Sequence, residues 1–456
     1  VRMKVVKFGG SSLASGEQLE KVYGIVTSDP ERKFVVVSAP GKRSSEDTKV
    51  TDLLIACAEK RMNGEDLSAE LKMLLDRYGS IAAELNLPLE VMDQIEADFL
   101  QVIDGDREHK EQYLDAVKAS GEDNNAKLIA AYFQAMGTKA TYVNPKDAGL
   151  FVSDEPGNAQ VLPESYEHLY KLRDIGGIVI FPGFFGFTKA GHIATFSRSG
   201  SDITGSILAN GIKAHVYENF TDVDAVFSVN PTIVDNPKEI KELTYREMRE
   251  LSYAGFSVFH DEALIPAFRA CIPVNVRNTN NPSAPGTFIV NARENTNGPV
   301  TGIASDKGFC SIYISKYLMN RELGFGRKLL QILEDYGISY EHIPSGIDDI
   351  TVILRENQMD EAKEEKIVSR IYEELQADKV EVEHGLSLLM IVGEGMRHNV
   401  GTTARASQAL AEAGVNIEMI NQGSSEVSMM FGIKAIQERK AVQALYNAFF
   451  VGAVTV

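Results

Sequence analysis

Short apolar runs alternate with longer helical patterns over the first part of the chain. Because strands that alternate with helices build parallel sheets covered on both faces, this order predicts an α/β fold with a mainly parallel sheet sandwiched by helices. Residues 51–150 are helical and charged, and we expect them to form outer helices beside the functional site. The expected strands cover residues 3–6, 34–38, 141–143, 177–182, 214–217 and 274–276.

The second part of the chain contains an internal repeat. It follows two polar segments, 278–286 and 291–299, which are typical of a turn and a linker. Each copy combines strands, a Gly-rich turn and amphipathic helices, which predicts two tandem βαββαβ units. The expected domains are residues 1–298, 299–384 and 385–456. A shift of 77 positions aligns the copies and matches Gly324 with Gly401, Leu333 with Leu410, Gly337 with Gly414 and Gly346 with Gly423.

The length and the net charge of the chain limit the number of domains and the kinds of partner that we expect. A chain of 456 residues is long enough for two or three domains. Its 46 Lys and Arg against 64 Asp and Glu residues give a net charge of −18, which argues against nucleic acid and anionic membranes as partners.

Cys57, Cys271 and Cys310 match no metal-binding spacing and indicate reduced thiols in a cytoplasmic protein. We expect neither a signal peptide nor a membrane span, since the most apolar run, 178–181, ends at a Pro-Gly pair.

The first candidate functional segment lies at the end of the first expected strand. There Lys7 precedes Phe8, Gly9, Gly10 and Ser11. Glycines let backbone N–H groups approach a phosphate, a helix N-terminus that follows favours negative charge, and a lysine can neutralise a phosphoryl group. The segment therefore favours a nucleoside triphosphate, with a plain strand-to-helix turn as the alternative.

The second candidate segment, residues 195–202, places a cation, hydroxyl groups and a carboxylate on one loop before an apolar helix. Arg198 could bind a substrate carboxylate, because its planar guanidinium matches two oxygens, or it could form a surface ion pair. Asp202 could cap the helix, act in the site, or do both.

The third candidate segment is acidic and follows the strand expected at 214–217. Asp222 and Asp224 could face metal-bound phosphate or a nucleotide ribose. The segment lacks the glycine and the glutamate of a calcium loop, and a solvated turn is the alternative. Glu122 and Thr51, in the helical region, add candidate polar contacts.

Taken together, these segments resemble the monofunctional aspartate kinases of the amino-acid-kinase fold. The resemblance extends over essentially the whole chain, and the two repeats look like the paired ACT domains that regulate such enzymes. No dehydrogenase domain is expected after them. The motifs that carry the resemblance are residues 7–12, 120–122, 196–202, 221–224 and 245–255, in the order of the family.

The resemblance implies ATP-dependent phosphorylation of the side-chain carboxylate of L-aspartate to 4-phospho-L-aspartate, the first step toward lysine, threonine and methionine. Lys7 and Asp202 correspond to catalytic residues, Glu122 to the residue that receives the substrate ammonium group, and Arg198 to the one that binds its α-carboxylate. Mg²⁺ would arrive with ATP, and no side chain is assigned as its ligand. The aspartate positions are Thr51, Glu122, Arg198 and Ser201, and the ATP positions are Lys7, Gly9, Gly10, Ser11, Thr221, Asp222, Phe227, Thr232 and Ser257.

Three departures from the family pattern leave other functions open. Ser199 replaces a glycine and would be strained if its φ were positive, while Thr232 and Ser257 replace cations expected near ATP. A weak catalyst that serves as an amino-acid sensor, or a kinase for another small carboxylate, are therefore the alternatives.

The repeats are expected to bind an amino-acid effector, lysine or threonine, at an interface between subunits of a homodimer or larger assembly. The alternatives are that the repeats only extend the core and that the candidate residues are core or turn positions. These candidates are Met319, Leu323, Gly324, Ser339, Tyr340, Glu341 and Ser345.

Overall fold

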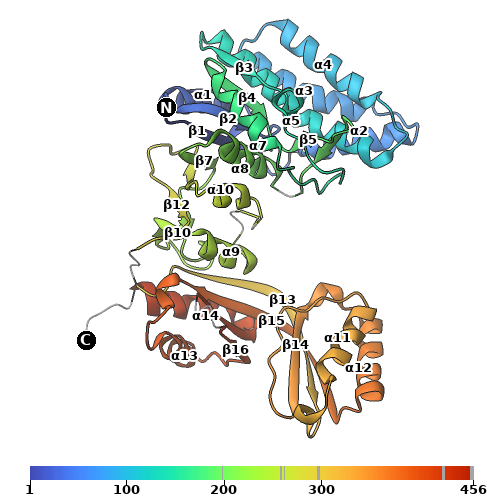
Figure 1. The fold of residues 1–456 in the computed structure, drawn as a ribbon, viewed down its shortest axis with the longest axis vertical. Helices are drawn as coiled ribbons and strands as arrows, with labels where there is room; N and C mark the ends of the chain where they lie inside the picture. Colours follow the sequence, from blue (N-terminus) through green and yellow to red (C-terminus); the bar gives the residue numbers. More distant parts are fainter. Residues whose placement is uncertain (198, 257–258, 261, 295–297, 424–426, 452–456) are drawn as a thin grey trace. The chain divides into compact units, whose positions relative to one another are not determined.

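The computed structural model describes residues 1–197, 199–256, 259–260, 262–294, 298–423 and 427–451. The chain forms two compact units. The N-terminal unit comprises Val1–Val226, Glu239–Met248 and Ser257–Arg293, and the C-terminal unit comprises Phe227–Lys238, Arg249–Phe256 and Glu294–Val456. Figure 1 labels the helices and strands of both.

An eight-stranded sheet forms the centre of the N-terminal unit, and its strand order is β10-β12-β11-β7-β1-β2-β4-β3. Neighbouring strands run parallel except for β11 and β12. The predicted fold class is therefore confirmed, and the first residue of each expected strand lies within two positions of the first residue of an observed strand. The strands are β1 (Lys4–Phe8), β2 (Arg32–Val37), β3 (Ala140–Tyr142), β4 (Ile178–Pro182), β7 (Val216–Thr221), β10 (Glu242–Thr244), β11 (Val274–Asn278) and β12 (Thr287–Val290).

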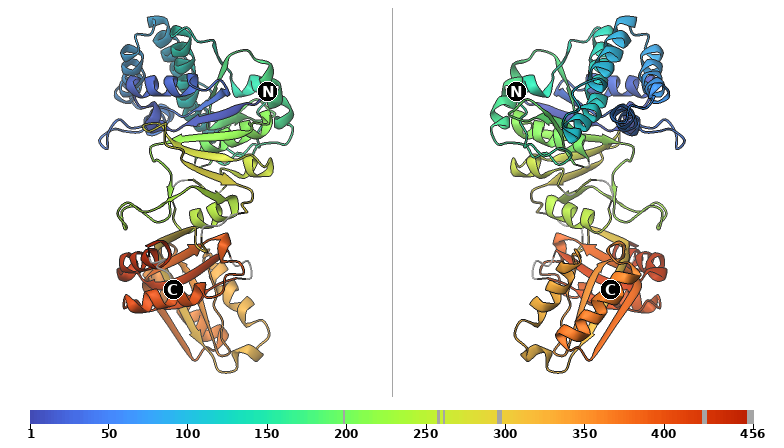
Figure 2. Two further views of the ribbon diagram at one scale, coloured as in Figure 1. Left: turned by 90° about the vertical axis from the view of Figure 1, so that its left-hand side faces the viewer. Right: turned by 90° about the vertical axis from the view of Figure 1, so that its right-hand side faces the viewer.

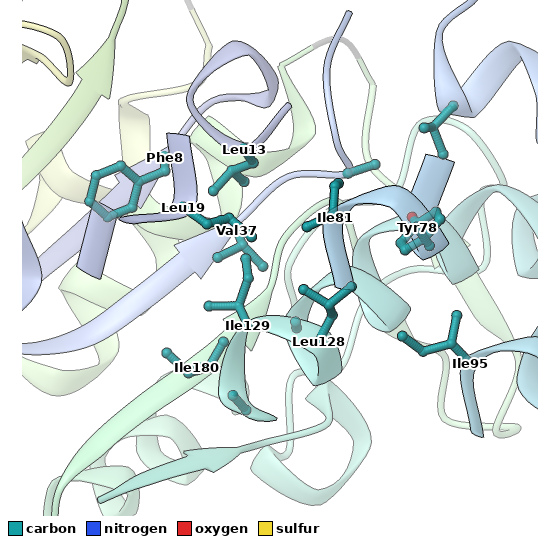
Figure 3. Close-up of a cluster of buried hydrophobic side chains, with 14 of the residues drawn as sticks. Phe8, Leu13, Leu19, Val37, Tyr78, Ile81, Ile95, Leu128, Ile129 and Ile180 are labelled. Atoms are coloured by element: carbon teal, nitrogen blue, oxygen red, sulfur yellow. The ribbon is translucent and has the colours of Figure 1, made fainter. Parts of the chain in front are cut away.

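Helices cover both faces of this sheet (Figure 1). Val6 and Val35 join the core under α1 and α5, which Figure 3 shows in close-up, whereas Val5 and Val36 are buried on the opposite face. Alternate residues of one strand therefore serve two cores. The helices are α1 (Gly16–Thr27), α2 (Val50–Met62), α3 (Ser68–Glu84), α4 (Leu89–Ile103), α5 (Lys110–Ala135), α6 (Pro145–Ala148), α7 (Ser165–Tyr170), α8 (Gly200–Ile212), α9 (Tyr245–Tyr253) and α10 (Ile265–Arg269).

Shorter elements complete this part of the chain. They include the 3-10 helices η1 (Gly10–Leu13) and η2 (Lys171–Asp174) and the antiparallel pair β5 (Phe185–Phe187) and β6 (Ile193–Thr195), together with β8 (Val226–Phe227) and β9 (Glu239–Ile240). The helical region expected at 51–150 is confirmed by α2 to α5. Within the described part of the chain, no helix combines the length and the apolar composition that crossing a bilayer requires.

The two repeat copies share one five-stranded antiparallel sheet in the C-terminal unit, in the order β14-β13-β15-β17-β16. Figure 2 shows this sheet and its helices in the orange and red part of the chain. The strands are β13 (Gly302–Ser315), β14 (Asp349–Arg355), β15 (Lys379–Val392), β16 (Met419–Asn421) and β17 (Ser428–Lys434). The helices are α11 (Phe325–Asp335), α12 (Glu361–Leu375), α13 (Thr402–Glu412), α14 (Glu438–Tyr446) and the short η3 (Met319–Arg321), η4 (Glu356–Gln358), η5 (Glu394–Met396), η6 (Ala435–Gln437) and η7 (Asn447–Val451).

Strands β13 and β15 are equivalent under the 77-residue repeat, and they pair with each other in antiparallel fashion. Each strand serves two cores, because Ile303 packs with the helices of the second copy and Ile312 with those of the first. An irregularity beside Gly308 shifts the alternation of side chains by one residue, so both isoleucines face helices. The domain boundary expected at 384/385 therefore falls inside β15.

Candidate active site

A cavity of about 640 Å³ lies in the N-terminal unit where β1, β2 and β4 end. The carboxyl ends of parallel strands are the usual position of ligand sites in α/β proteins. The cavity brings together seven of the expected site residues, Lys7, Gly9, Gly10, Thr51, Glu122, Ser201 and Asp202. It is also lined by Ser38, Lys49, Ile55, Lys118, Gly157, Phe184, Phe196, Ser197, Ser199 and Gly200.

The glycine segment after β1 lies against a second backbone segment. A Cβ atom on Gly41 would lie 2.3 Å from the carbonyl carbon of Gly10, and the Gly41 N–H donates to the Gly10 carbonyl at 2.8 Å. This close approach explains why neither position can carry a side chain without a backbone shift. The expectation of a helix directly after the glycines needs correction, because only the short η1 follows and α1 begins later, at Gly16.

Lys7 and Asp202 form an ion pair in the cavity wall. The Lys7 Nζ atom lies 2.7 Å from Asp202 Oδ1, and the two side chains are only 10% and 12% exposed. Lys7 comes from β1 and Asp202 from the first turn of α8, so the pair joins a strand end to a helix start. A buried pair of this kind holds a fixed cation and a carboxylate at the place where a ligand would enter.

Two backbone segments meet tightly at the start of α8. Ser199 has a φ of 59°, the left-handed conformation for which the sequence predicted strain, and Phe184 has a φ of 87°. A Cβ atom on Gly200 would lie 2.5 Å from the ring of Phe184, and one on Gly183 would lie 2.6 Å from Ser201 Oγ. Only glycines therefore allow these two segments to contact each other.

Glu122 places a carboxylate with a missing partner in the cavity. It is buried in α5, and its Oε1 atom accepts a bond from the Ala39 N–H at 3.3 Å. Its Oε2 atom is buried and has no hydrogen-bond partner among the described residues. Burial raises the pKa of Glu122 to about 8. A cationic group of a ligand would donate a hydrogen bond to Oε2, and its positive charge would neutralise the carboxylate.

Lys118 and Lys49 are cavity residues that the sequence reasoning missed. Lys118 lies one helical turn before Glu122 on α5, and its Nζ atom is 3.2 Å from Asp115 Oδ1. The spacing of four residues from Glu122 on a helix was a signal that could have identified it. Lys49 comes directly before α2 and carries no comparable signal.

Several expected site residues lie elsewhere. Ser11 is exposed at the start of η1, and the Thr221 hydroxyl donates to Asp222 at 3.2 Å outside this cavity. Phe227 belongs to the C-terminal unit, as does Thr232, whose N–H and hydroxyl both donate to Asn230 Oδ1. Arg198 and Ser257 lie outside the described residues.

The acidic segment after β7 has a structural partner. Asp224 Oδ1 accepts bonds from the side-chain amides of Asn278 at 2.9 Å and Asn281 at 3.0 Å. These bonds tie the segment to the turn after β11. Among the residues that the structure describes, no group of three or more His, Cys, Asp or Glu side chains could hold a metal ion.

Three of the expected effector residues precede α11 in the chain, and the other four follow its end. Gly324 has a φ of 78° directly before that helix, Leu323 is 95% exposed, and Met319 is buried. Ser339 donates to Gln358, Tyr340 is half-exposed, and Glu341 lies 3.8 Å from Arg355, while Ser345 donates to a backbone carbonyl. In the second copy, a cavity of about 280 Å³ is lined by the equivalent positions Met396, Val400, Gly401 and Gln422, together with His398, Asn399, Thr402 and Thr403.

Comparisons with known proteins agree with this arrangement. The amino acid kinase family matches residues 2–278, and an ACT domain matches residues 389–449. Aspartokinase 3 of Bacillus subtilis is 71% identical over 452 residues, which cover 99% of this chain and 100% of the relative. The chain belongs to the aspartokinases of the amino acid kinase family. The family and the enzyme class predicted from the sequence are thereby confirmed.

More distant aspartokinases also match nearly the whole chain, in sequence or in structure. Chloroplastic aspartokinase 1 of Arabidopsis thaliana is 29% identical over 461 residues, covering 98% of this chain and 80% of the relative. The crystal structure of Clostridium acetobutylicum aspartate kinase has a TM-score of 0.88 at 38% identity and covers 98% of this chain and 100% of that one. Escherichia coli aspartokinase III, in complex with aspartate and ADP, shares the fold with a TM-score of 0.74 at 24% identity, over 98% and 100% of the two chains.

Proposed function

We propose that this aspartokinase transfers the γ-phosphoryl group of ATP to the side-chain carboxylate of L-aspartate. The observation that carries the proposal is the cavity that combines the Lys7–Asp202 pair with Glu122, whose Oε2 atom has no hydrogen-bond partner among the described residues. A carboxylate is already a nucleophile at neutral pH, so the reaction needs positioning and charge neutralisation rather than a strong base.

The aspartate end of the cavity would contain Glu122, Thr51 and Ser201. The α-ammonium group of aspartate would bind Glu122 Oε2, a buried atom for which the described part of the chain supplies no hydrogen-bond partner. Arg198, by its place in the family motif, would bind the α-carboxylate. Aspartate would then be bound through its α-ammonium and its α-carboxylate group, and its side-chain carboxylate would be directed toward the phosphate.

The ATP end of the cavity would contain Lys7, Gly9 and Gly10. The Lys7 ammonium group would neutralise the transferring phosphoryl group, and the glycines would let its oxygens approach the backbone. Mg²⁺ bound to the ATP phosphates would neutralise further charge. Ser11, Thr221, Asp222, Phe227, Thr232 and Ser257 remain predicted nucleotide contacts.

A hydroxamate assay tests this function most directly. The protein would be incubated with ATP and hydroxylamine together with aspartate, glutamate or no acceptor, since an acyl phosphate is trapped as its hydroxamate. Product with aspartate alone supports the proposal. Product with glutamate would point to a kinase for another carboxylate, and nucleotide binding without product would favour an amino-acid sensor.

We further propose that the C-terminal unit binds an amino-acid effector, lysine or threonine, near the start of α11. The support is the cavity at the equivalent positions of the second copy. Edge strands β14 and β16 could pair with a second copy of the chain, which would give a homodimer. Light scattering and inhibition by each amino acid would test both points. A division into a kinase domain (1–298) and ACT domains (299–384 and 385–456), and a cytoplasmic location, also remain predictions.

A further inference from the structure

The carboxylate of Asp202 has a second donor besides Lys7. The Asn219 Nδ2 atom donates to Asp202 Oδ1 at 2.8 Å, the same oxygen that Lys7 contacts at 2.7 Å. Asn219 lies on β7 and is 2% exposed. Lys7 and Asn219 are direct neighbours across the parallel pair of β1 and β7, so both side chains reach Asp202 from adjacent strands.

Strand β7 also holds the backbone of Asp202. The Tyr217 hydroxyl donates to the Asp202 carbonyl at 3.0 Å, and Asn219 Nδ2 lies 3.2 Å from the same hydroxyl. Space for this hydroxyl depends on Gly205 in α8, because a Cβ atom there would lie 2.3 Å from the Tyr217 oxygen. The first turns of α8 are therefore fitted to two polar side chains of β7 that lie two residues apart.

Lys7 and Asn219 differ in what else they can do. Lys7 lines the cavity, and under the proposed function its ammonium group also serves the phosphoryl group. When Lys7 shifts toward phosphate, Asp202 loses its strongest contact while a new negative charge arrives nearby. Asn219 does not line this cavity. Its amide is neutral, so it does not titrate and is not drawn toward the phosphoryl group as an ammonium group is.

Without a second donor, the carboxylate of Asp202 would have an alternative position. Asp202 lies in the first turn of α8, where free backbone N–H groups attract carboxylates. A side chain that turned back onto the helix would no longer face the reacting groups. The bond from Asn219 opposes that rotation.

We propose that Asn219 is a positioning residue that keeps the Asp202 carboxylate in place while Lys7 engages the transferring phosphoryl group. The proposal rests on the proposed phosphoryl transfer to aspartate. It predicts a defect in kcat, because Asn219 acts at the step in which Lys7 changes partner, and little change in the KM for aspartate or ATP.

The test compares Asn219→Leu with Asn275→Leu. Asn275 lies on the neighbouring strand β11, is 5% exposed, and lies outside the cavity. Both variants replace a buried amide by an apolar group of similar size in the same sheet. We expect Asn219→Leu to lower kcat by roughly tenfold to a hundredfold, the loss of one hydrogen bond to a charged group, and Asn275→Leu to retain wild-type kcat.

A double-mutant cycle with Asp202→Ala separates positioning from a general structural effect. If Asn219 acts through Asp202, Asn219→Leu reduces kcat in the wild-type background and not in Asp202→Ala. An equal loss in both backgrounds, or wild-type kcat in Asn219→Leu, would overturn the proposal. If Asn219→Leu shows no melting transition, Asn219→Ser replaces it in the same comparison.

The activity of the wild-type protein separates a failure of the proposed kinase function from a failure of the positioning role of Asn219. Wild-type protein that makes no hydroxamate with aspartate contradicts the proposed function and, with it, the role of Asn219. Wild-type protein that is active while Asn219→Leu is equally active contradicts only the positioning role.

Discussion

Glu122 in the N-terminal unit and Glu322 in the C-terminal unit carry the same side chain in opposite settings. Glu122 is buried, one of its oxygens has no partner among the described residues, and burial raises its pKa to about 8. Glu322 is partly exposed and lies between Lys316 and Lys328. The bond from Lys316 lowers the pKa of Glu322 below its usual range.

The burial and the partners of these two carboxylates distinguish a candidate ligand site from a stabilising contact. A buried carboxylate oxygen without a partner is unfavourable in the folded protein, so such a group marks a candidate ligand site. A paired surface carboxylate contributes a little stability, and nothing more is needed to explain it. Removing charge should therefore affect function in the first region and only stability in the second.

The largest effect is expected when Lys7, the cavity cation that pairs with Asp202, is removed. Lys7→Ala should lower kcat by roughly a few hundredfold, because the lysine stabilises charge that develops as the phosphoryl group moves. Steady-state ATP turnover and a thermal melt on the same preparation would measure it. Lys4→Ala is the control, since Lys4 lies on the same strand and pairs with Asp29 at 2.8 Å outside the cavity. Equal turnover in the two variants would sink the role of Lys7.

The next effect concerns Glu122, one of the two carboxylates that line the cavity. Glu122→Gln should raise the KM for aspartate by about tenfold or more, because the amide cannot pair with an ammonium group. Asp123→Asn is the control, since it changes the adjacent residue of α5, which does not line this cavity. A change in the KM for ATP alone would show that Glu122 contacts ATP and not aspartate.

The same variant should be more stable than the wild type, with a defined pH dependence. The pKa of Glu122 rises from 4.5 when unfolded to about 8 when folded, so the folded protein keeps a proton that the unfolded chain releases. Between these two pKa values, ionisation of Glu122 favours the unfolded chain. The free energy of unfolding of the wild type therefore falls as pH rises toward about 8 and is then constant in this respect. Urea unfolding at about pH 6 and about pH 9 should show a larger gain for Glu122→Gln at the higher pH. An equal gain at both values would contradict the raised pKa.

A smaller effect is expected from the backbone of the cavity. Ser199 precedes α8 with a φ of 59°, whereas α11 and α13 are preceded by Gly324 and Gly401 with φ values of 78° and 96°. Ser199→Gly should therefore stabilise the protein by about 1 kcal/mol, and Gly324→Ser should destabilise it by about the same amount. Denaturant unfolding of both variants measures the two changes. A loss of stability in Ser199→Gly would show that the serine side chain contributes more than its strain costs.

The smallest effect is expected at Glu322. Glu322→Gln should lower the free energy of unfolding by at most about 1 kcal/mol at neutral pH, because exposed pairs are screened by solvent and salt. Since the pKa of Glu322 is lowered on folding, the loss should disappear as pH falls through its folded pKa. A large loss of kcat in this variant would break the contrast between the two carboxylates.

Much of the fold could be predicted from local patterns. Strands β2 and β4 contain continuous apolar runs, which bury both faces of the sheet and leave little choice of position. The 77-residue repeat predicted two related modules, and the positions of β13 and β15 follow that shift. It did not predict that the two copies share one sheet, since strand pairing depends on contacts between residues far apart in the sequence.

The candidate site divides in the same way. Lys7, Gly9 and Gly10 belong to one short segment, and the motifs around Glu122 and Asp202 are recognisable by themselves. The sequence alone thus determined the fold class, the repeat, the family and the segments that form the cavity. The packing of the chain determines that Lys118 lines the cavity and that Glu122 Oε2 has no hydrogen-bond partner in the described ranges. It also brings Asn219 and Lys7 to one oxygen of Asp202. The physical reason is that burial, pKa and shared hydrogen bonds arise from neighbours in space, and the order of residues specifies them only after the chain has packed.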